Sequence, residues 1–376
     1  MEKYKLVISA TNITEGGPLR ILKDAVLSAK KALSNKWEII VLVNNNNLLN
    51  EDNIKLIEFS KSKMPWISRI YQEFFLFNTF SKKNEIDIWL SLQDISPIVK
   101  AKRQVVYFHS PIIFYRFKFI ECFLETKSLI RKYLNKHLYR FNIHSNYAVV
   151  VQQEWVRSEV INFSKHKNVI VAHPIINDFT KKDNFNKIVV KNNEFKTFIY
   201  PTLPRVHKNI EIICKAVEIL EKKSINNFEV KITIDGKENK YAKYIFKKYN
   251  HLKTIKFIGL QNRSSINDLY ASSDAMIFPS KIETWGLPIS EAITFNLPII
   301  ISDLEYAYES IGSYQNVFYF NHNNDFLLAK IIESFLENKL KYTSLNSLPN
   351  KKPFAPNWNA LWKQLIIDLD NENIND

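Results

Sequence analysis

Two carboxylates stand close together in an otherwise apolar stretch, FPSKIETWGLPISEAITFNLPII, which covers residues 278–300. Glu283 and Glu291 are separated by seven residues, with Gly286 and Pro288 between them. Pro288 is well placed to begin a helix, so we predict Glu283 in a loop and Glu291 in the first helical turn. Both acids would then lie near a helix N-terminus, which favours negative charge. A second interpretation stays open, in which Glu291 only complements the helix dipole and Glu283 is solvated.

Glycines mark further positions where a ligand could approach the backbone, because the chain has only six of them. Gly16 and Gly17 lie between the first predicted strand and the helix that follows it. Their N–H groups, together with the helix N-terminus, could approach an anion such as a phosphate. A plain strand-to-helix turn is the alternative, since the GxGxxG pattern is absent. Gly236 and Gly259 each end a predicted strand, at the edge where open α/β sheets bind ligands.

Short β-branched or aromatic runs alternate with longer helical patterns, as in βαβ units on a parallel sheet. We therefore expect an α/β protein with two successive open sheets whose strand ends face each other across a cleft. The runs predicted as strands are 5–9, 38–43, 104–109, 146–152 and 168–172, followed by 195–201, 230–235, 254–259, 274–279 and 297–302.

A polar, charged stretch divides the chain. We predict a first domain over residues 1–180, a linker over 181–196 and a second domain over 197–350. Residues 351–376 form a tail with apolar residues at helical spacing from Trp358 to Leu365. This stripe must be buried, and we expect the helix to pack back towards the first domain.

Composition bounds the class of protein. The 376 residues are 46% hydrophobic, enough for two ordinary cores. Neither Cys122 nor Cys214 belongs to a paired spacing, which argues against a disulfide framework or a cysteine metal site and favours a reducing cytoplasm. We see no signal peptide and no run of about 18 apolar residues, so we expect a protein that is neither exported nor membrane-spanning.

The net charge of +14 is concentrated in the first half of the chain. Residues 1–200 hold 31 basic against 18 acidic side chains, whereas residues 201–376 hold 21 against 20. A lopsided basic surface suggests an anionic partner such as nucleic acid or an acidic membrane. A lysine-rich bias that serves solubility is the alternative.

The stretch FPSKIETWGLPISEA resembles the signature of glycosyltransferase family 4, retaining nucleotide-sugar transferases that have two Rossmann-like domains in the GT-B fold. Glu283 and Glu291 meet the family's E-x7-E motif, and the resemblance covers roughly residues 5–335. Within the family, the chain looks like a bacterial surface-polysaccharide enzyme. Companion segments occur in order: Gly16 and Gly17 in the glycine loop, His109 in VVYFHSP, Arg205 and Lys208 in PTLPRVHKN, FIGL at 257–260 and the strand, helix and strand of 266–280.

The resemblance implies a role for each of these groups. Arg205, Lys208 and the amides around Gly17 would stabilise a diphosphate leaving group without a metal. Glu291 would accept two hydrogen bonds from a ribose diol, and Glu283 would accept hydrogen bonds from the transferred hexose. The further positions implied are His109, which would donate to the sugar or diphosphate; Trp285, Gly286 and Leu287, whose amides could reach the same groups; and Gly236 and Leu260, which bound the region that selects the base.

The reaction implied is transfer with retention of anomeric configuration, in which the departing phosphate takes the proton of the acceptor. We assign no protein general base, no metal and no cofactor, and we favour a UDP-hexose or UDP-N-acetylhexosamine over GDP-mannose as donor. Arg205 lies closer to Lys208 than in many relatives, and His109 could instead be structural.

The acceptor is expected on the N-terminal domain, which carries the charge excess. Residues 114–140 mix aromatic with basic side chains, as in an interfacial segment on anionic lipid. We therefore expect a polyprenyl-diphosphate-linked saccharide acceptor at the inner face of the cell membrane, in the synthesis of O-antigen, capsule or another surface polysaccharide. A solvated helix with a buried aromatic face is the alternative.

Three competing functions remain. A nucleotide-sugar epimerase would share the architecture, and a non-catalytic partner subunit would share the fold without the activity. A nucleic-acid-binding protein is favoured only by charge and aromatics, and the nearly neutral second half lacks any such motif. We expect no nucleic-acid partner.

Overall fold

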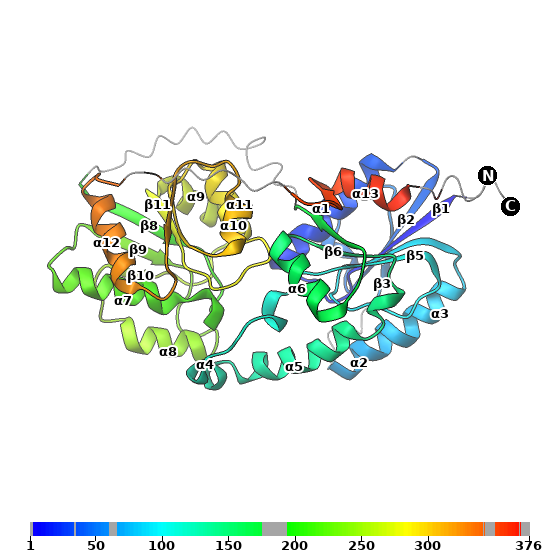
Figure 1. Cartoon of the computed structure of the whole chain (residues 1–376), viewed down its shortest axis with the longest axis horizontal. Coiled ribbons are helices and arrows are strands. Elements are labelled where there is room, and N and C mark those ends of the chain that lie inside the picture. The colour runs from blue at the N-terminus through cyan, green and yellow to red at the C-terminus, as the bar shows by residue number, and fades with distance from the viewer. Residues whose placement is uncertain are drawn as a thin grey trace. The chain divides into compact units, whose positions relative to one another are not determined.

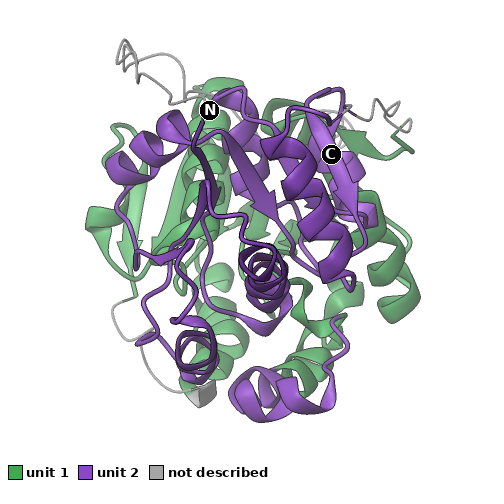
Figure 2. Cartoon of the chain, turned by 90° about the vertical axis from the view of Figure 1, so that its left-hand side faces the viewer, with its two compact units in different colours: residues 1–114, 132–175, 349–376 green, residues 115–131, 176–348 purple. Residues whose placement is uncertain are grey.

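The computed structural model describes residues 3–33, 35–59, 66–174, 194–340, 342, 350–367 and 369. The chain forms two compact units, coloured in Figure 2: a first unit of residues 1–114, 132–175 and 349–376, and a second unit of residues 115–131 and 176–348. Segment 115–131 therefore belongs to the second unit, a difference from the predicted first domain of 1–180. The predicted linker 181–196 lies outside the described residues except for its last three.

The first unit is built on an eight-stranded sheet with the order β14-β7-β6-β5-β4-β1-β2-β3. Every pairing in it is parallel, from Tyr4 opposite Trp37 to Phe354 opposite Val171. Its strands are β1 (Tyr4–Ser9), β2 (Trp37–Val43), β3 (Lys55–Glu58), β4 (Ile86–Ser91), β5 (Ala101–Tyr107), β6 (Ala148–Val151), β7 (Val169–Ala172) and β14 (Phe354–Ala355), labelled in part in Figure 1.

Helices cover this sheet because their apolar residues recur on one face. In α1 (Gly16–Ala32) the buried residues include Leu22, Ala25, Val26 and Ala29, at the spacing of one helical stripe. The other helical segments are α2 (Trp66–Tyr71), the π-helix η3 (Gln72–Leu76), α3 (Phe77–Lys82), α6 (Glu154–Ser164) and α13 (Trp358–Ile366), with short 3-10 turns at η1 (Asn46–Leu48), η4 (Pro111–Ile113) and η5 (Ile143–Ser145).

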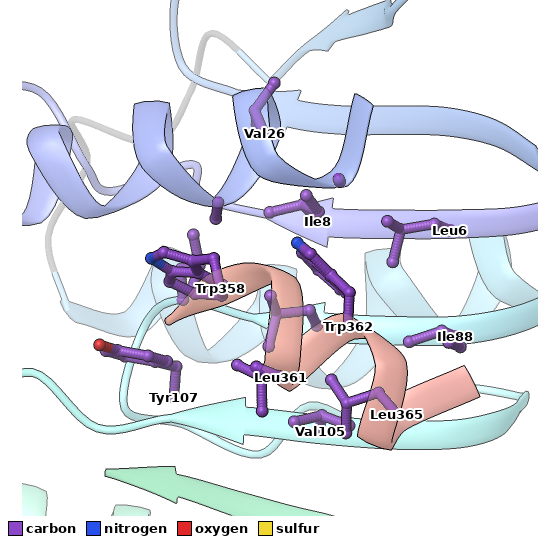
Figure 3. Close-up of a cluster of buried hydrophobic side chains, with 14 of the residues drawn as sticks. Leu6, Ile8, Val26, Ile88, Val105, Tyr107, Trp358, Leu361, Trp362 and Leu365 are labelled. Carbon is purple, nitrogen blue, oxygen red and sulfur yellow. The ribbon is translucent and has the colours of Figure 1, made fainter. Parts of the chain in front are cut away.

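The predicted C-terminal helix is confirmed as α13, and it completes the core of the first unit. Figure 3 shows its apolar side chains against residues of β1, β4, β5 and α1. Trp358, Leu361, Trp362 and Leu365 are all at most 2% exposed. The chain end is therefore part of the first unit's core, whose other members, apart from Ala355, all lie between Leu6 and Ala172.

The second unit has a six-stranded sheet with the order β10-β9-β8-β11-β12-β13, again with parallel pairings throughout the described strands. These strands are β8 (Lys196–Tyr200), β9 (Phe228–Ile232), β10 (Ile255–Phe257), β11 (Ala275–Phe278), β12 (Ile299–Ser302) and β13 (Val317–Phe320). Its helices are α4 (Phe119–Leu124), α7 (Ile210–Lys222), α8 (Lys240–Tyr249), α9 (Arg263–Ser272), α10 (Leu287–Thr294), α11 (Glu305–Ile311) and α12 (Asp325–Leu336), and α5 (Thr126–Arg140) begins in this unit and ends in the first.

Two parallel α/β sheets confirm the predicted fold class. Within the described part of the chain, no helix combines the length and the apolar character that crossing a membrane requires.

Candidate functional site

The predicted donor residues of the second unit follow neighbouring strands. Arg205 and Lys208 come after β8: Arg205 directly precedes the 3-10 turn η6 (Val206–Lys208), and Lys208 is its last residue. Gly236 comes after β9. Leu260 follows β10, and Glu283 follows β11. Because the four strands are parallel and adjacent, their carboxyl ends meet at one edge of the sheet. The structure thus brings these five residues to the same edge.

Lys208 and Glu283 form an ion pair at this edge. Lys208 Nζ lies 2.5 Å from Glu283 Oε1, and the two side chains are 19% and 10% exposed. The Tyr200 hydroxyl donates to the Lys208 carbonyl over 2.7 Å, and the Lys281 amide donates to the His207 carbonyl over 2.7 Å. The loops after β8 and β11 are therefore joined by both backbone and side chains, and they hold an ammonium group and a carboxylate together.

Glu291 lies in α10 but not in its first turn, which corrects the sequence prediction. It is the fifth residue of the helix, since α10 begins at Leu287. Its two oxygens have partners from α9: Arg263 Nη1 lies 2.7 Å from Oε1, and the Tyr270 hydroxyl donates to Oε2 over 2.9 Å. Burial, and then the charge of Glu291, raise the pKa of Tyr270 well above its usual value. Tyr270 therefore stays a hydrogen-bond donor to this carboxylate.

The turn between the two acids needs a glycine. Gly286 has φ +76°, and a Cβ added to it would lie 2.8 Å from Ile289 Cδ1. The Trp285 ring is 5% exposed and its indole N–H donates to Ser290 Oγ over 2.9 Å, so this side chain anchors the start of the helix rather than facing a ligand. Leu287 is the first helical residue, and its N–H is one of those that a helix leaves without an internal acceptor.

Three other predicted donor-binding positions, Arg205, Gly236 and Leu260, lie in the loops that follow β8, β9 and β10. Arg205 is exposed, and it precedes η6 with an extended backbone. Gly236 has φ +88° and its N–H donates to Glu238 Oε2 over 3.0 Å, so part of its role is to shape the loop. Leu260 follows β10 at the sheet edge and is 74% exposed.

Sequence reasoning missed several residues of this site. Arg263 and Tyr270 hold Glu291, yet they stand 28 and 21 positions from it, a distance at which no local pattern is readable. His207 is half-buried in the loop after β8, directly before Lys208. Burial, and then the charges of Lys208, Arg205 and Lys281, lower its pKa well below the usual value. Its imidazole is therefore neutral at neutral pH.

The first unit gathers its predicted residues at the carboxyl edge of its own sheet. Gly16 begins α1 after β1 with φ +70°, and a Cβ on it would meet nothing within 4 Å, so the space beside Gly16 is open. Gly17 follows it as the second residue of this helix. His109 follows β5, and the amides of His109 and Ser110 donate to Asp94 Oδ1, a residue that the sequence did not single out. Burial lowers the pKa of His109, opposed by the charge of Asp94 and a backbone hydrogen bond to Leu92.

Two further features bound the chemistry. Among the described residues, no group of three or more His, Cys, Asp or Glu side chains could hold a metal ion. A cavity of about 670 Å³ in the second unit is lined by Asn209 and Lys281, but not by Lys208, Glu283 or Glu291. This cavity therefore borders the loops of the site and is not the site itself.

Residues 180–348 match the family model described as Glycosyl transferases group 1. The second unit carries a group 1 glycosyltransferase domain. The uncharacterized glycosyltransferase MJ1607 of Methanocaldococcus jannaschii is 24% identical over 125 residues, which span 33% of this chain and 31% of that relative. The match thus covers less than a third of the length of that relative.

Solved structures resemble the whole chain. Sucrose-phosphate synthase from Thermosynechococcus elongatus has a TM-score of 0.65 at 12% identity, with 90% of each chain covered. Anabaena HepE in complex with UDP-glucose has a TM-score of 0.62 at 16% identity, with 99% of each chain covered. The fold is GT-B, as predicted.

Within the glycosyltransferase domain, the arrangement combines a fixed cation with two carboxylates. Lys208 can stabilise a negative leaving group, whereas Glu283 and Glu291 can accept hydrogen bonds from hydroxyls. Each carboxylate oxygen has two lone pairs, so the Lys208 partner of Glu283 and the two partners of Glu291 leave capacity for a ligand. The amides at the start of α10 lie in the same loop as Glu283, where helix N-termini favour anions.

Proposed function

We propose that this chain is a retaining, metal-independent glycosyltransferase that moves a hexose or N-acetylhexosamine from a nucleotide sugar to a saccharide acceptor. The observation that carries this proposal is the partly buried Lys208–Glu283 pair at the carboxyl edge of a group 1 glycosyltransferase domain, with Glu291 in the following helix.

The proposed reaction breaks the bond between the anomeric carbon and the donor phosphate, and forms a bond from that carbon to an acceptor oxygen on the same face. The acceptor proton goes to a phosphate oxygen of the departing nucleotide. Lys208 and Arg205 stabilise the charge that develops on the diphosphate, because preorganised cations act most strongly where charge appears in the transition state. Glu283 accepts from the sugar hydroxyls, Glu291 from the ribose diol, and His109 donates to the sugar or diphosphate.

We favour a UDP-sugar as the donor. The similar structure of HepE was determined with UDP-glucose, and the acidic and basic groups of this chain suit a ribose diol and a diphosphate. A base is selected by contacts near residues 236–260, where Gly236 and Leu260 lie at the sheet edge.

A membrane-associated acceptor is supported by an exposed mixed surface. On α4, which belongs to the second unit and not to the predicted N-terminal domain, the apolar side chains of Phe119, Ile120 and Phe123 are 79%, 63% and 64% exposed. Lys118 precedes this helix, and Lys127 follows it at the start of α5. Aromatic and basic side chains together suit an anionic lipid surface, where each basic residue contributes about 1 kcal/mol. We propose a lipid-linked saccharide acceptor at such a surface, in the synthesis of a cell-surface polysaccharide.

Vesicle pelleting at low salt tests the membrane proposal. The chain should pellet with vesicles that contain anionic lipid and not with zwitterionic ones, and Phe119→Ser/Phe123→Ser should release it. Phe326→Ser is the matched control, because Phe326 is 62% exposed on a different helix. Pelleting that is equal for both variants and the wild type would contradict this part of the proposal.

The activity itself is tested by incubating the chain with UDP-, GDP-, dTDP- and ADP-sugars in the presence of EDTA, with oligosaccharide acceptors. We expect nucleotide release from one donor class, and a product whose anomeric proton coupling matches that of the donor. An inverted product would refute retention, a requirement for added metal would refute metal independence, and an epimerised donor without transfer would identify an epimerase.

A further inference from the structure

Segment 115–131 interrupts the first unit in sequence but belongs to the second unit in structure. Its two glutamates, Glu121 and Glu125, are each 6% exposed, whereas the aromatic side chains of Phe119 and Phe123 are largely exposed. Hydrophobic burial alone would favour buried aromatic rings and exposed carboxylates, because carboxylates are buried only where they are paired or hydrogen-bonded. The contacts of the two glutamates therefore need an explanation.

Glu121 is bound to the loop that carries Glu283. Its Oε1 lies 2.7 Å from Lys281 Nζ, two residues before Glu283, and both side chains of this ion pair are nearly buried, 8% and 12% exposed. Its Oε2 accepts from the Tyr115 hydroxyl at 2.9 Å and from the Lys118 amide at 2.8 Å. The carboxylate thus joins the start of α4 to the loop after β11.

Glu125 is bound to the other loop of the site. Its Oε1 accepts from the Val206 amide over 2.8 Å, and Val206 directly follows Arg205 and lies two residues before Lys208. The ring of Tyr115 also contacts the His207 ring edge-on, with 5.9 Å between ring centroids. The same short segment therefore contacts both loops that supply the Lys208–Glu283 pair.

The two loops also contact each other, through the Lys281 amide on the His207 carbonyl and through the ion pair itself. Segment 115–131 adds a third connection, because Glu121 binds the loop after β11 and Glu125 binds the loop after β8. These two contacts together fix the separation of the two loops. Neither glutamate is in a position given to the donor above, so each would act through the residues it holds.

We propose that Glu121 and Glu125 are positioning residues, which hold the loops after β11 and β8 so that Lys208 and Glu283 meet the donor together. The consequence for the donor rests on the proposed function, whereas the positioning of the loops does not. The proposal predicts two separate effects, one on the loops of the free protein and one on catalysis.

Hydrogen exchange of the full chain measures the first effect without any ligand. We expect the Lys281 amide to exchange about tenfold faster in Glu121→Ala, and the Val206 amide about tenfold faster in Glu125→Ala, because each loop opens more often. Glu125→Gln keeps an acceptor oxygen and should retain slow exchange at Val206. Glu333→Ala is the matched control, since it removes another ion pair of 2.7 Å in the same unit, with Lys223.

Unchanged exchange at both amides overturns the proposal, as does acceleration that is uniform over the second unit. If Glu121→Ala does not fold, Tyr115→Phe removes only the hydroxyl that holds the same carboxylate. Faster exchange confined to the loop of Lys281 then supports the proposal, and none overturns it.

Kinetics measures the second effect. In Glu121→Gln and Glu125→Ala we expect the KM for the donor to rise about tenfold, while the KM for the acceptor stays unchanged and Glu333→Ala behaves as wild type. Equal losses for both substrates would indicate a structural role only and overturn the proposal. A wild type that turns over no nucleotide sugar refutes the proposed function, and the amide exchange then still decides the positioning role.

Discussion

Replacing Lys208 by methionine should lower both stability and activity, for separable reasons. The substitution leaves the carboxylate of Glu283, whose side chain is 10% exposed, without the ammonium group that lies 2.5 Å away. Removing one partner of a buried ion pair costs about 3–5 kcal/mol. Since the Lys208 side chain is 19% exposed, we expect the lower end of that range, about 3 kcal/mol, or roughly 6–12 °C in Tm for a domain of this size class.

The double variant Lys208→Met/Glu283→Gln separates the two losses. It no longer contains an unpaired buried charge, so most of the lost stability should return, and the coupling energy of the cycle should exceed about 1 kcal/mol. Activity should not return, because the cation for the leaving group is still missing, a loss of about 100-fold or more in turnover. The measurements are urea unfolding and initial rates with the preferred nucleotide sugar.

Two results would refute this reasoning. If Lys208→Met unfolds like the wild type, the pair is not a buried charge interaction. If the double variant regains turnover along with stability, the pair serves the fold and not the reaction.

Three other predictions concern separate features. Burial raises the pKa of Glu73 from 4.5 to about 8, so between these values the native state keeps a proton that the unfolded state releases. The wild type should therefore become progressively less stable relative to Glu73→Gln as pH rises; a constant difference between the urea midpoints of the two proteins at pH 5, 6.5 and 8 would contradict this. Gly286→Ala should lower the free energy of unfolding by roughly 1–2 kcal/mol more than Gly312→Ala, measured by thermal unfolding. Both glycines have positive φ, but a Cβ at Gly286 would lie 2.8 Å from a side chain, whereas a Cβ at Gly312 would meet nothing within 4 Å. Equal losses would show that only backbone strain matters. Tyr270→Phe removes the donor to Glu291 Oε2 and should weaken UDP binding about fivefold in calorimetry; an unchanged affinity would show that the hydroxyl does not orient this carboxylate.

Local sequence signals predicted the loop and helix around the two acids well. The run that forms β11 is buried throughout, Gly286 marks the turn, and Pro288 is the second residue of α10, which begins one residue earlier than predicted. The strand, the turn and the helix start depend on residues that are close in sequence, so local patterns could predict them. The partners of Glu291 could not be predicted in this way, because they depend on how α9 packs against α10.

The strand β4 was missed for a related reason. Its sequence, IDIWLS, places Asp87 within an apolar run, and a charged residue argues against a buried strand. In the structure, Asp87 Oδ2 accepts from the Lys5 amide of β1 over 2.8 Å, and Oδ1 lies 3.0 Å from Lys102 Nζ of β5. Neighbouring strands thus satisfy the acid, and only the tertiary structure reveals them.

The position of segment 115–131 could not be read from chain order either. The predicted first domain, residues 1–180, includes it because it lies between the predicted strands 104–109 and 146–152, before the polar linker. Its buried acids pair with Lys281, 160 positions from Glu121, and with Val206, 81 positions from Glu125. Contacts at such separations leave no periodic signal.

Calorimetric titration of nucleotides in the presence of EDTA tests the central claim most directly. UDP, GDP, dTDP and ADP should be titrated into the wild type and into Glu291→Ala, with Glu333→Ala as the control in the same unit. We predict that one nucleotide, UDP, binds the wild type and the control, and that Glu291→Ala binds it at least about tenfold more weakly, because the ribose diol loses its acceptor. Binding of no nucleotide, or equal binding by Glu291→Ala, would contradict the assignment of this edge of the second sheet as the donor site.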